Sequence, residues 1–313
     1  MSELQQTLAE EAREHFGTDA SIEDLVSLAG GASRELYGFD VIAGAERHEL
    51  VLRRDPPGLE EREARARELA VLRAAHEGGV PVPVPRWMTG DGTGIVMQRV
   101  GGEAIARRLL RDDRYATARE RLVDEVARAA AAVHALAPPA EVPALTAPPA
   151  LAAIDALEDQ LDQLGEPHPA LELGLRWLRE RLPPEREPTL VHGDLRLGNL
   201  MVDEGGLVAV LDWEQCHAGD GAEDLGWMCL RSWRFGADEH PALGVGTRAA
   251  LLEAYAAAGG REVSPDELLF WEVLGNVRWG VICVIQAQRA TLEHYAIGRR
   301  ACEPEWDLLG LIR

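Results

Sequence analysis

The sequence contains no lysine, so each of its 32 basic side chains is an arginine. They are outnumbered by 53 aspartates and glutamates, which gives a formal net charge of -21. A surface with this excess of negative charge repels phosphate backbones and anionic lipid, so a general nucleic-acid or membrane-surface role is disfavoured. Any fixed positive charge that a binding site requires must come from an arginine.

Cysteine is also scarce, and its four copies are scattered: Cys216, Cys229, Cys283 and Cys302. With no CxxC pair and no tight cluster, neither a disulfide framework nor a zinc site is indicated, and reduced thiols in a cytoplasmic protein are expected. The acidic, amphipathic residues 1–16 are unlike a secretory signal. Long uninterrupted apolar runs are missing as well. Residues 268–288 form the most apolar stretch, and polar side chains inside it favour a buried helix over a membrane span.

The predicted elements change in character near residue 100. Residues 3–16 and 60–76 have helical periodicity, whereas strands are expected at 25–28, 35–42, 48–53 and 94–100. After Gly101-Gly102 the pattern becomes helical. We therefore predict an α+β protein with two lobes, a small β-rich N-lobe over residues 1–100 and a larger helical C-lobe over 101–313, joined by a hinge near 97–102.

The most informative segment, residues 190–214, reads LVHGDLRLGNLMVDEGGLVAVLDWE. Asp194 and Asn199 are five residues apart, which is the D-x-x-x-x-N spacing of loops that transfer phosphoryl groups. Such transfer needs a carboxylate that orients the attacking hydroxyl and accepts its proton, together with oxygen ligands for magnesium. Both kinds of group are present in this segment.

The same segment predicts a hairpin. If Gly205-Gly206 form a two-residue turn, Glu204 pairs with Leu207, and counting back places Asn199 directly opposite Asp212. Cross-strand partners are about 5 Å apart at Cβ, so both side chains could bind one cation. The spacing therefore predicts a metal site made of Asn199 and Asp212.

Two other interpretations compete with this one. The segment could be a surface hairpin with incidental polar residues and His192 as a core histidine. It could also belong to a metal hydrolase using His192, Asp194 and Asp212, but no second histidine stands at ligand spacing and Asn199 would have no role.

HGDLRLGNLMVD followed by VLDWE resembles the motifs of the aminoglycoside phosphotransferase family, which has the protein-kinase-like fold. VLRRDPPG and GRRACEPEWDLL resemble the branch whose members include kinase-like domains fused to acyl-CoA dehydrogenases. The resemblance implies that Asp194 is the catalytic base, that Asn199 and Asp212 hold Mg²⁺, and that His192 braces the loop. Asp224 resembles the family's structural aspartate, and a helix N-terminal role explains it equally well.

Arginines replace the lysines that related kinases use. Arg196, two residues after Asp194, either stabilises the transferring phosphoryl group or faces solvent. Arg53 stands where a strand lysine is usual, and Glu68 is its expected helix partner. Arg54 competes with Arg53, although strand alternation points it to the opposite face.

Further nucleotide contacts follow from the same resemblance. Gly31 and Ser33 lie in a short loop of small residues whose amides could approach phosphate, although an ordinary hairpin turn explains the loop as well. Met97 would be the gatekeeper, and the backbone groups of Gln98 and Val100 would meet adenine.

The resemblance implies a kinase that uses ATP or GTP with Mg²⁺ to phosphorylate a hydroxyl of a small molecule. The acceptor is either an aminoglycoside-like cation or a hydroxy acid or acyl compound; the candidate clamps for the acid are Arg231, Arg234, Arg278 and Arg299. A nucleotide-binding pseudokinase is the alternative, supported by the absent strand lysine. A protein kinase is disfavoured, because no A-P-E motif follows Asp212.

Overall fold

The computed structural model describes residues 3–28, 34–58, 60–288 and 292–312. The helices are α1 (Glu3–Phe16), α2 (Arg62–Glu77), α3 (Ala106–Arg111), α4 (Ala116–His134), α5 (Pro149–Leu164), α6 (Pro169–Arg179), α7 (Ala222–Met228), α8 (Arg248–Ala257), α9 (Pro265–Ala287), α10 (Leu292–Gly298) and α11 (Cys302–Leu311). The strands are β1 (Ser21–Leu28), β2 (Glu35–Ala43), β3 (Glu46–Arg54), β4 (Pro85–Met88), β5 (Gly94–Gln98), β6 (Thr189–Val191), β7 (Leu200–Val202), β8 (Leu207–Val210) and β9 (His217–Gly219).

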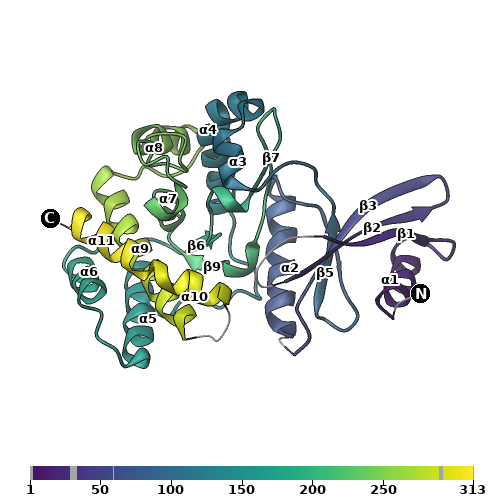
Figure 1. Cartoon of the computed structure of the whole chain (residues 1–313), viewed down its shortest axis with the longest axis horizontal. Coiled ribbons are helices and arrows are strands. Elements are labelled where there is room, and N and C mark those ends of the chain that lie inside the picture. Colours follow the sequence, from purple (N-terminus) through teal and green to yellow (C-terminus); the bar gives the residue numbers. More distant parts are fainter. Residues whose placement is uncertain (1–2, 29–33, 59, 289–291, 313) are drawn as a thin grey trace.

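The N-terminal part is a five-stranded antiparallel sheet in the order β1-β2-β3-β5-β4. Helix α1 lies against it near the N-terminus, and α2 stands between it and the helical part, at the left of the sheet in Figure 1. The carboxylate of Glu11 on α1 accepts hydrogen bonds from Trp87 Nε1 at 2.8 Å and from the Gly90 amide at 2.7 Å. These two bonds attach α1 to the sheet.

Strand alternation sorts the side chains of β3 between two cores. Leu50 and Leu52 pack with α1, whereas Val51 packs against the core that contains α2. Because side chains on a strand point alternately to opposite faces, Arg53 shares the α2 face with Val51. Arg54 lies on the other face, where its Nε is 3.6 Å from the carboxylate of Glu35.

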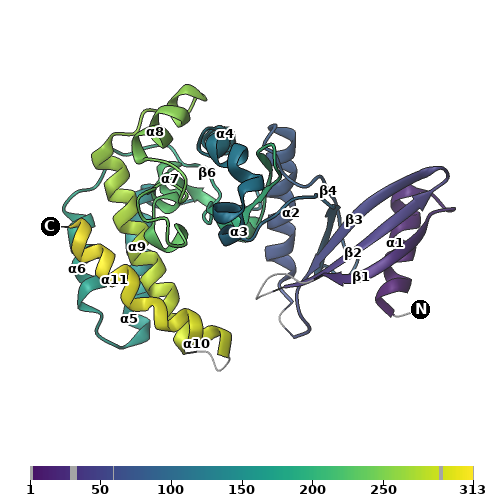
Figure 2. The same cartoon turned by 45° about the horizontal axis from the view of Figure 1, so that its top comes forward.

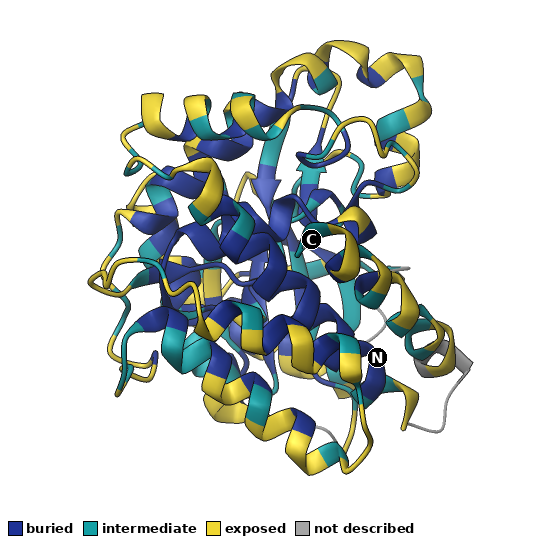
Figure 3. Cartoon of the chain, turned by 90° about the vertical axis from the view of Figure 1, so that its left-hand side faces the viewer, coloured by how far each residue is buried: buried dark blue, intermediate teal, exposed yellow. Residues whose placement is uncertain are grey.

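The C-terminal part is built around α9, which packs against α5, α6, α7, α10 and α11. Ser264 caps this helix by accepting a hydrogen bond from the Glu267 amide, and Pro265 opens it. Figure 2 shows α9 running through the helical part, and Figure 3 shows buried residues at the centre with exposed ones on the outer helices. By length and composition α9 could cross a membrane, but 78% of its most apolar window is buried inside the protein. The predicted buried helix is therefore confirmed.

One hydrophobic core runs from the sheet side into the helical part. It contains Leu72 of α2 and Met97 of β5 together with Leu122 of α4 and Leu200 of β7. The chain between the two parts also forms a β-bridge, in which the amides of Glu103 and Val202 each donate to the other residue's carbonyl, at 2.8 and 3.0 Å.

The α+β plan of a β-rich part followed by a helical part is confirmed, and most predicted elements agree with the observed bounds within a few residues. The predicted lobe boundary at residue 100 stays a prediction. One hydrophobic core contains residues from both sides of that position.

Gly226 of α7 provides a test of this packing. A Cβ at this position would lie 2.4 Å from the backbone carbonyl carbon of Trp271 in α9, so Gly226→Ala should lower the free energy of unfolding by about 1–3 kcal/mol through overpacking. The control is Gly310→Ala in α11, where a Cβ would meet nothing within 4 Å. Alanine there should be neutral or stabilising by about 1 kcal/mol. Urea unfolding of both variants measures the difference; equal effects would contradict the close approach of α7 and α9.

Candidate active site

Asp194 follows β6, which pairs with β9 and brings the loop to the centre of the helical part. The preceding residue, Gly193, has φ of +79°, and a Cβ there would lie 2.5 Å from the backbone oxygen of Gln215. Glycine is therefore required for both the backbone conformation and the close approach of the two chain segments.

Three donors hold the Asp194 carboxylate. Oδ1 accepts hydrogen bonds from Trp227 Nε1 at 2.8 Å and Arg196 Nε at 2.9 Å, and Oδ2 accepts from Asn199 Nδ2 at 2.6 Å. The side chain is 16% exposed, so it is fixed in one orientation while its edge remains accessible. The sequence prediction that Asp194, Arg196 and Asn199 share one site agrees with this arrangement, whereas the hydrogen bond from Trp227 to Asp194 was not predicted.

His192 is completely buried and connects this loop to the segment before Asp212. Its Nδ1 accepts a hydrogen bond from the Asp194 amide at 3.2 Å, which places the proton on Nε2, and Nε2 donates to the Leu211 carbonyl at 3.0 Å. This is the geometry that the predicted bracing role requires.

Asp224, in the first turn of α7, holds the loop from behind. Its carboxylate accepts hydrogen bonds from the backbone amides of His192 at 2.8 Å and Gly193 at 2.9 Å, and from His134 Nε2 at 3.0 Å. Burial alone would raise the pKa of this carboxyl group, but these donors outweigh it and lower the pKa of Asp224 to about 2. Asp224 is therefore a structural anion that sets the backbone path of the loop.

The predicted hairpin forms, but its predicted register is wrong. Val202 pairs with Leu207 and the Leu211 amide donates to the Asn199 carbonyl, so Asn199 lies opposite Leu211 and not Asp212. The reason is the turn, which spans residues 203–206 because Asp203 Oδ1 accepts from the amides of both glycines. A bulge between residues 201 and 202 then shifts the ladder.

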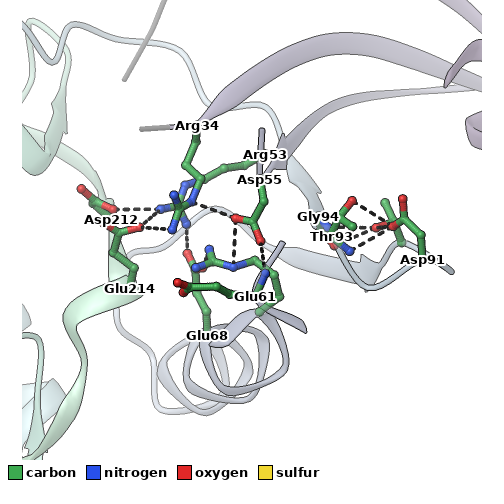
Figure 4. Close-up of polar contacts among 12 residues, drawn as sticks. Arg34, Arg53, Asp55, Glu61, Glu68, Asp91, Thr93, Gly94, Asp212 and Glu214 are labelled. Atoms are coloured by element: carbon green, nitrogen blue, oxygen red, sulfur yellow. Dashed lines mark hydrogen bonds and ion pairs between the residues drawn. The ribbon is translucent and has the colours of Figure 1, made fainter. Parts of the chain in front are cut away.

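Arg53 connects the two parts of the chain, as Figure 4 shows. Its guanidinium pairs with Glu68 of α2, and its Nη2 lies 3.1 Å from Asp212 Oδ1 and 2.8 Å from Glu214 Oε2. Burial disfavours the charged guanidinium, but the three carboxylates outweigh it and raise the pKa of Arg53. The predicted partnership of Arg53 with Glu68 is present, and Arg54 is excluded from it by facing the other side.

Two further charged residues, Arg65 and Asp55, hold Glu68 and its neighbours in place. Arg65 of α2 pairs with Glu68, and its Nε is 3.4 Å from Asp55 Oδ1. Asp55 is completely buried and also accepts a hydrogen bond from the Glu61 amide at 3.0 Å. These contacts within the protein hold the Glu68 carboxylate in position.

The remaining nucleotide contacts stay predictions, and the structure shows the setting of two of the residues. Met97 is 8% exposed within the shared core. The Gln98 amide donates to the Val84 carbonyl at 2.9 Å, so it is already used within the protein. Gly31 and Ser33 lie outside the described residues, and the contact of Val100 with adenine stays a prediction.

Three tryptophans form a row beside Asp194. Ring centroids are 5.3 Å apart for Trp227 and Trp233 and 4.8 Å apart for Trp233 and Trp279. Arg196 stacks on Trp233, and Arg278 stacks on Trp227. The arginine candidates for the acceptor thus differ in setting: Arg278 stands one indole ring from Asp194, whereas Arg234 is buried against Glu272 and Arg231 pairs with Asp238.

The oxygen atoms near the loop suit magnesium. Asn199 uses its amide nitrogen toward Asp194, so its Oδ1 can serve as a ligand, and the Asp212 side chain is 36% exposed. Mg²⁺ takes hard oxygen ligands and needs only one or two from a protein when it is shared with phosphates. In the described part of the chain, His, Cys, Asp and Glu form no group of three or more that could hold a metal.

The family model of the phosphotransferase enzyme family, named APH, matches residues 24–264, and the chain therefore belongs to this family. The predicted phosphotransferase is confirmed at this level. A local match fits the predicted resemblance to the fused branch: over 64 residues the chain is 44% identical to the mouse (Mus musculus) acyl-CoA dehydrogenase family member 10. That segment covers 20% of this chain and 6% of the mouse protein.

Solved structures share the fold over nearly the whole chain. Macrolide 2'-phosphotransferase MphH from Brachybacterium faecium has a TM-score of 0.63 and 21% identity, covering 95% of this chain and 98% of its own. A putative fructosamine-3-kinase from Thermobifida fusca has a TM-score of 0.64 and 16% identity, covering 97% and 98%. The aminoglycoside phosphotransferase APH(4)-Ia, in a ternary complex with AMP-PNP and hygromycin B, has a TM-score of 0.64 and 16% identity, covering 98% of both chains. The predicted two-lobed protein-kinase-like fold is confirmed.

Several residues of the site were missed by sequence reasoning. Trp227 belongs to a helix, and no local pattern shows that its indole reaches a loop 33 residues away. Glu214 was visible in the VLDWE motif, two residues after Asp212, but its contact with Arg53 depends on the fold.

Trp227 should influence phosphoryl transfer through Asp194. Trp227→Phe keeps an aromatic ring in the row but removes the donor to Oδ1, and a hydrogen bond to a charged group contributes about 1.5–3 kcal/mol. We expect kcat to fall about 10-fold or more while the KM for nucleotide stays unchanged, measured by steady-state kinetics.

Trp233→Phe is the matched control. Trp233 is equally buried in the same row, but within the described residues its Nε1 has no hydrogen-bond partner. Its replacement should leave kcat nearly unchanged, and equal losses in the two variants would show that Trp227 acts only through packing.

Proposed function

We propose that the protein is an ATP- and Mg²⁺-dependent O-phosphotransferase that acts on a hydroxyl group of a small molecule. The observation that carries the proposal is the Asp194 carboxylate, which is held by three donors in a chain of the phosphotransferase enzyme family. APH(4)-Ia, which has the same fold, forms ternary complexes with AMP-PNP or ADP and hygromycin B, which supports the choice of nucleotide and of acceptor size.

In this proposal Asp194 performs the proton chemistry. The acceptor hydroxyl donates its hydrogen bond to the accessible edge of the carboxylate, which orients the oxygen toward the γ-phosphorus of ATP. The carboxylate takes the proton as the new oxygen–phosphorus bond forms, while the bond from the γ-phosphorus to the bridging oxygen breaks and ADP leaves. Trp227 and Asn199 prevent the carboxylate from rotating away. Arg196, beside Asp194 and stacked on Trp233, supplies positive charge close to the transferring group.

Asn199 Oδ1 and the Asp212 carboxylate would hold Mg²⁺. The ion, when bound, offsets the negative charge of the phosphate oxygens during transfer. His192 and Asp224 keep these two ligands in place, because His192 ties the Asp194 loop to the residue before Asp212 and Asp224 holds the loop backbone. Asp212 adopts a left-handed backbone conformation with φ of 65°, which turns the chain sharply at the proposed metal ligand.

The pseudokinase alternative is weakened by the setting of Arg53. It rested on the missing strand lysine, but the arginine has the helix glutamate partner that a phosphate-binding lysine would need. Its guanidinium also keeps its charge and can contact two phosphate oxygens at once. Binding of nucleotide without transfer to any acceptor would restore the alternative.

Asp194→Ala tests the proposed base. We expect kcat for transfer from ATP to fall by at least about 100-fold, because general-base catalysis contributes about 10²–10⁴-fold. The isosteric Asp194→Asn variant keeps the packing and should lose activity as strongly. Transfer of radiolabelled γ-phosphate measures the rates; wild-type activity in both variants would remove Asp194 from the mechanism.

The proposed acceptor site is a cavity of about 330 Å³ between α5, β9 and α9. Gln215 and His217 of its wall adjoin the Asp194 loop, since a Cβ on Gly193 would lie 2.5 Å from the Gln215 oxygen and His217 pairs with Val191. Among the described residues that line it, Glu223 is the single carboxylate, and it already accepts hydrogen bonds from Arg278 at 2.9 Å and His217 at 3.1 Å.

This charge arrangement favours one class of acceptor. Burial lowers the pKa of His217, but Glu223 outweighs burial and raises it, so Glu223 favours the protonated imidazole. A polycationic aminoglycoside would find no free carboxylate in this cavity. A hydroxylated molecule that is neutral or carries a carboxylate fits its cations and its apolar wall better.

An acceptor screen with ATP should therefore show phosphorylation of hydroxy acids or their acyl derivatives in preference to aminoglycosides. Arg278→Met should raise the KM of such an acceptor by about 10-fold or more, since a charged hydrogen bond is lost, and leave the KM of ATP unchanged. Arg231→Met, which removes an exposed arginine outside this cavity, is the control. Preference for aminoglycosides would overturn the acceptor assignment without affecting that of Asp194.

A further inference from the structure

We propose that Arg34 and Arg53 together form a clamp for the phosphate groups of the nucleotide, and that the Glu214 carboxylate occupies this clamp when no nucleotide is bound. The inference rests on the proposed function, because it assigns a second cation to the nucleotide site of that reaction. It also gives Glu214 a role, that of a competitor for the two arginines.

The geometry of three side chains carries the proposal. Glu214 Oε2 lies 3.1 Å from Arg34 Nη2 and 2.8 Å from Arg53 Nη2, so two guanidinium groups converge on a single oxygen atom. Figure 4 shows both arginines pointing toward Glu214 from the sheet side. The arrangement of two guanidinium groups around one anionic oxygen also suits a phosphate oxygen. The planar guanidinium group of arginine matches the geometry of phosphate oxygens.

Arg34 is held in this position by the protein itself. Its Nε is 3.0 Å from Asp55 Oδ1, and Asp55 is completely buried and hydrogen-bonded to the Glu61 amide. The Arg34 side chain is only 17% exposed. One side of the guanidinium is therefore fixed, and the Nη2 side is directed at Glu214.

Strand register explains why the two arginines meet. Leu36 of β2 is the cross-strand partner of Arg53 in β3, so these two residues share one face of the sheet. Arg34 comes two residues before Leu36, so alternation along the chain directs it to the same face. Arg53 of β3 is thus joined by a second cation, Arg34, which directly precedes β2.

The balance of charge explains the role of Glu214. Of the ionic groups that meet here, Arg65, Glu68 and Asp55 are at most 3% exposed and already paired. Arg34 faces Asp55 and Glu214, and Arg53 faces Glu68, Asp212 and Glu214. Among the described residues, the cluster therefore has three arginines against four carboxylates. If Asp212 is engaged with the metal, Glu214 and the phosphate groups compete for the same guanidinium protons, and phosphate binding must displace Glu214.

Equilibrium binding of ATP, ADP and AMP to the whole chain tests this, by isothermal titration calorimetry with and without Mg²⁺ and without acceptor. Arg34→Met should raise the Kd of ATP by about 10-fold to 100-fold and leave the Kd of AMP within about two-fold, because the lost contacts are charged hydrogen bonds to the outer phosphates. Arg34→Lys, which keeps one charge, should fall between Arg34→Met and the wild type. A loss of affinity that is equal for ATP and AMP would overturn the clamp and assign Arg34 a structural role.

Arg54→Met is the matched control. Arg54 neighbours Arg53 in sequence and is similarly exposed at 24%, but it faces the opposite side of the sheet, and its Kd values should equal those of the wild type. A loss in Arg54→Met equal to that in Arg34→Met would overturn the assignment, because a general loss of positive charge would then explain both.

Glu214→Gln tests the competitor without removing either arginine. It should lower the Kd of ATP measured without Mg²⁺ several-fold, whereas a Kd that rises or does not change would overturn the role of Glu214. This variant also covers the case in which Arg34→Met fails to fold. If the wild type binds no nucleotide at all, the proposed function itself fails. If ATP binds to the wild type and equally well to Arg34→Met, only the clamp fails.

Discussion

The ion pair between Arg53 and Glu68 is the contact on which the geometry of the nucleotide side depends. It joins β3 to α2, and the same guanidinium reaches Asp212 and Glu214 in the other part of the chain. Charges buried to this extent are tolerated only when each has partners, since removing one partner leaves an uncompensated charge in a medium of low polarity. The network therefore ties the position of α2 to the segment that contains the proposed metal ligand.

The catalytic side is also organised by buried carboxylates, and there backbone amides and an indole donate hydrogen bonds to them. The buried carboxylate of Asp224 fixes the loop from behind, and the indole of Trp227, three residues later in the same short helix, fixes the carboxylate of Asp194. Helix α7 can do both because Gly226 lets it approach α9 closely. Packing between two helices thus determines the orientation of the proposed base.

The sequence was sufficient for the fold class and for grouping Asp194, Arg196 and Asn199, because hydrophobic periodicity and a short motif with fixed spacing are local signals. Alternation along β3 correctly separated Arg53 from Arg54. The sequence was insufficient to predict the hairpin register, since Asp203 stabilises a longer turn than the two glycines alone suggest. The hydrogen bond from Trp227 to Asp194 could not be predicted either, because a contact between a helix and a distant loop leaves no local signal in the sequence.

The replacement of the strand lysine by Arg53 has a consequence for chemical labelling. Nucleotide analogues that carry an acylating or sulfonylating group mark kinases by reacting with the side-chain amine that touches the phosphates. A guanidinium that stays protonated is a poor nucleophile, and no other side-chain amine exists in this sequence to react in its place. Surveys that enrich proteins by such reagents would pass over this enzyme even when its site is filled with nucleotide.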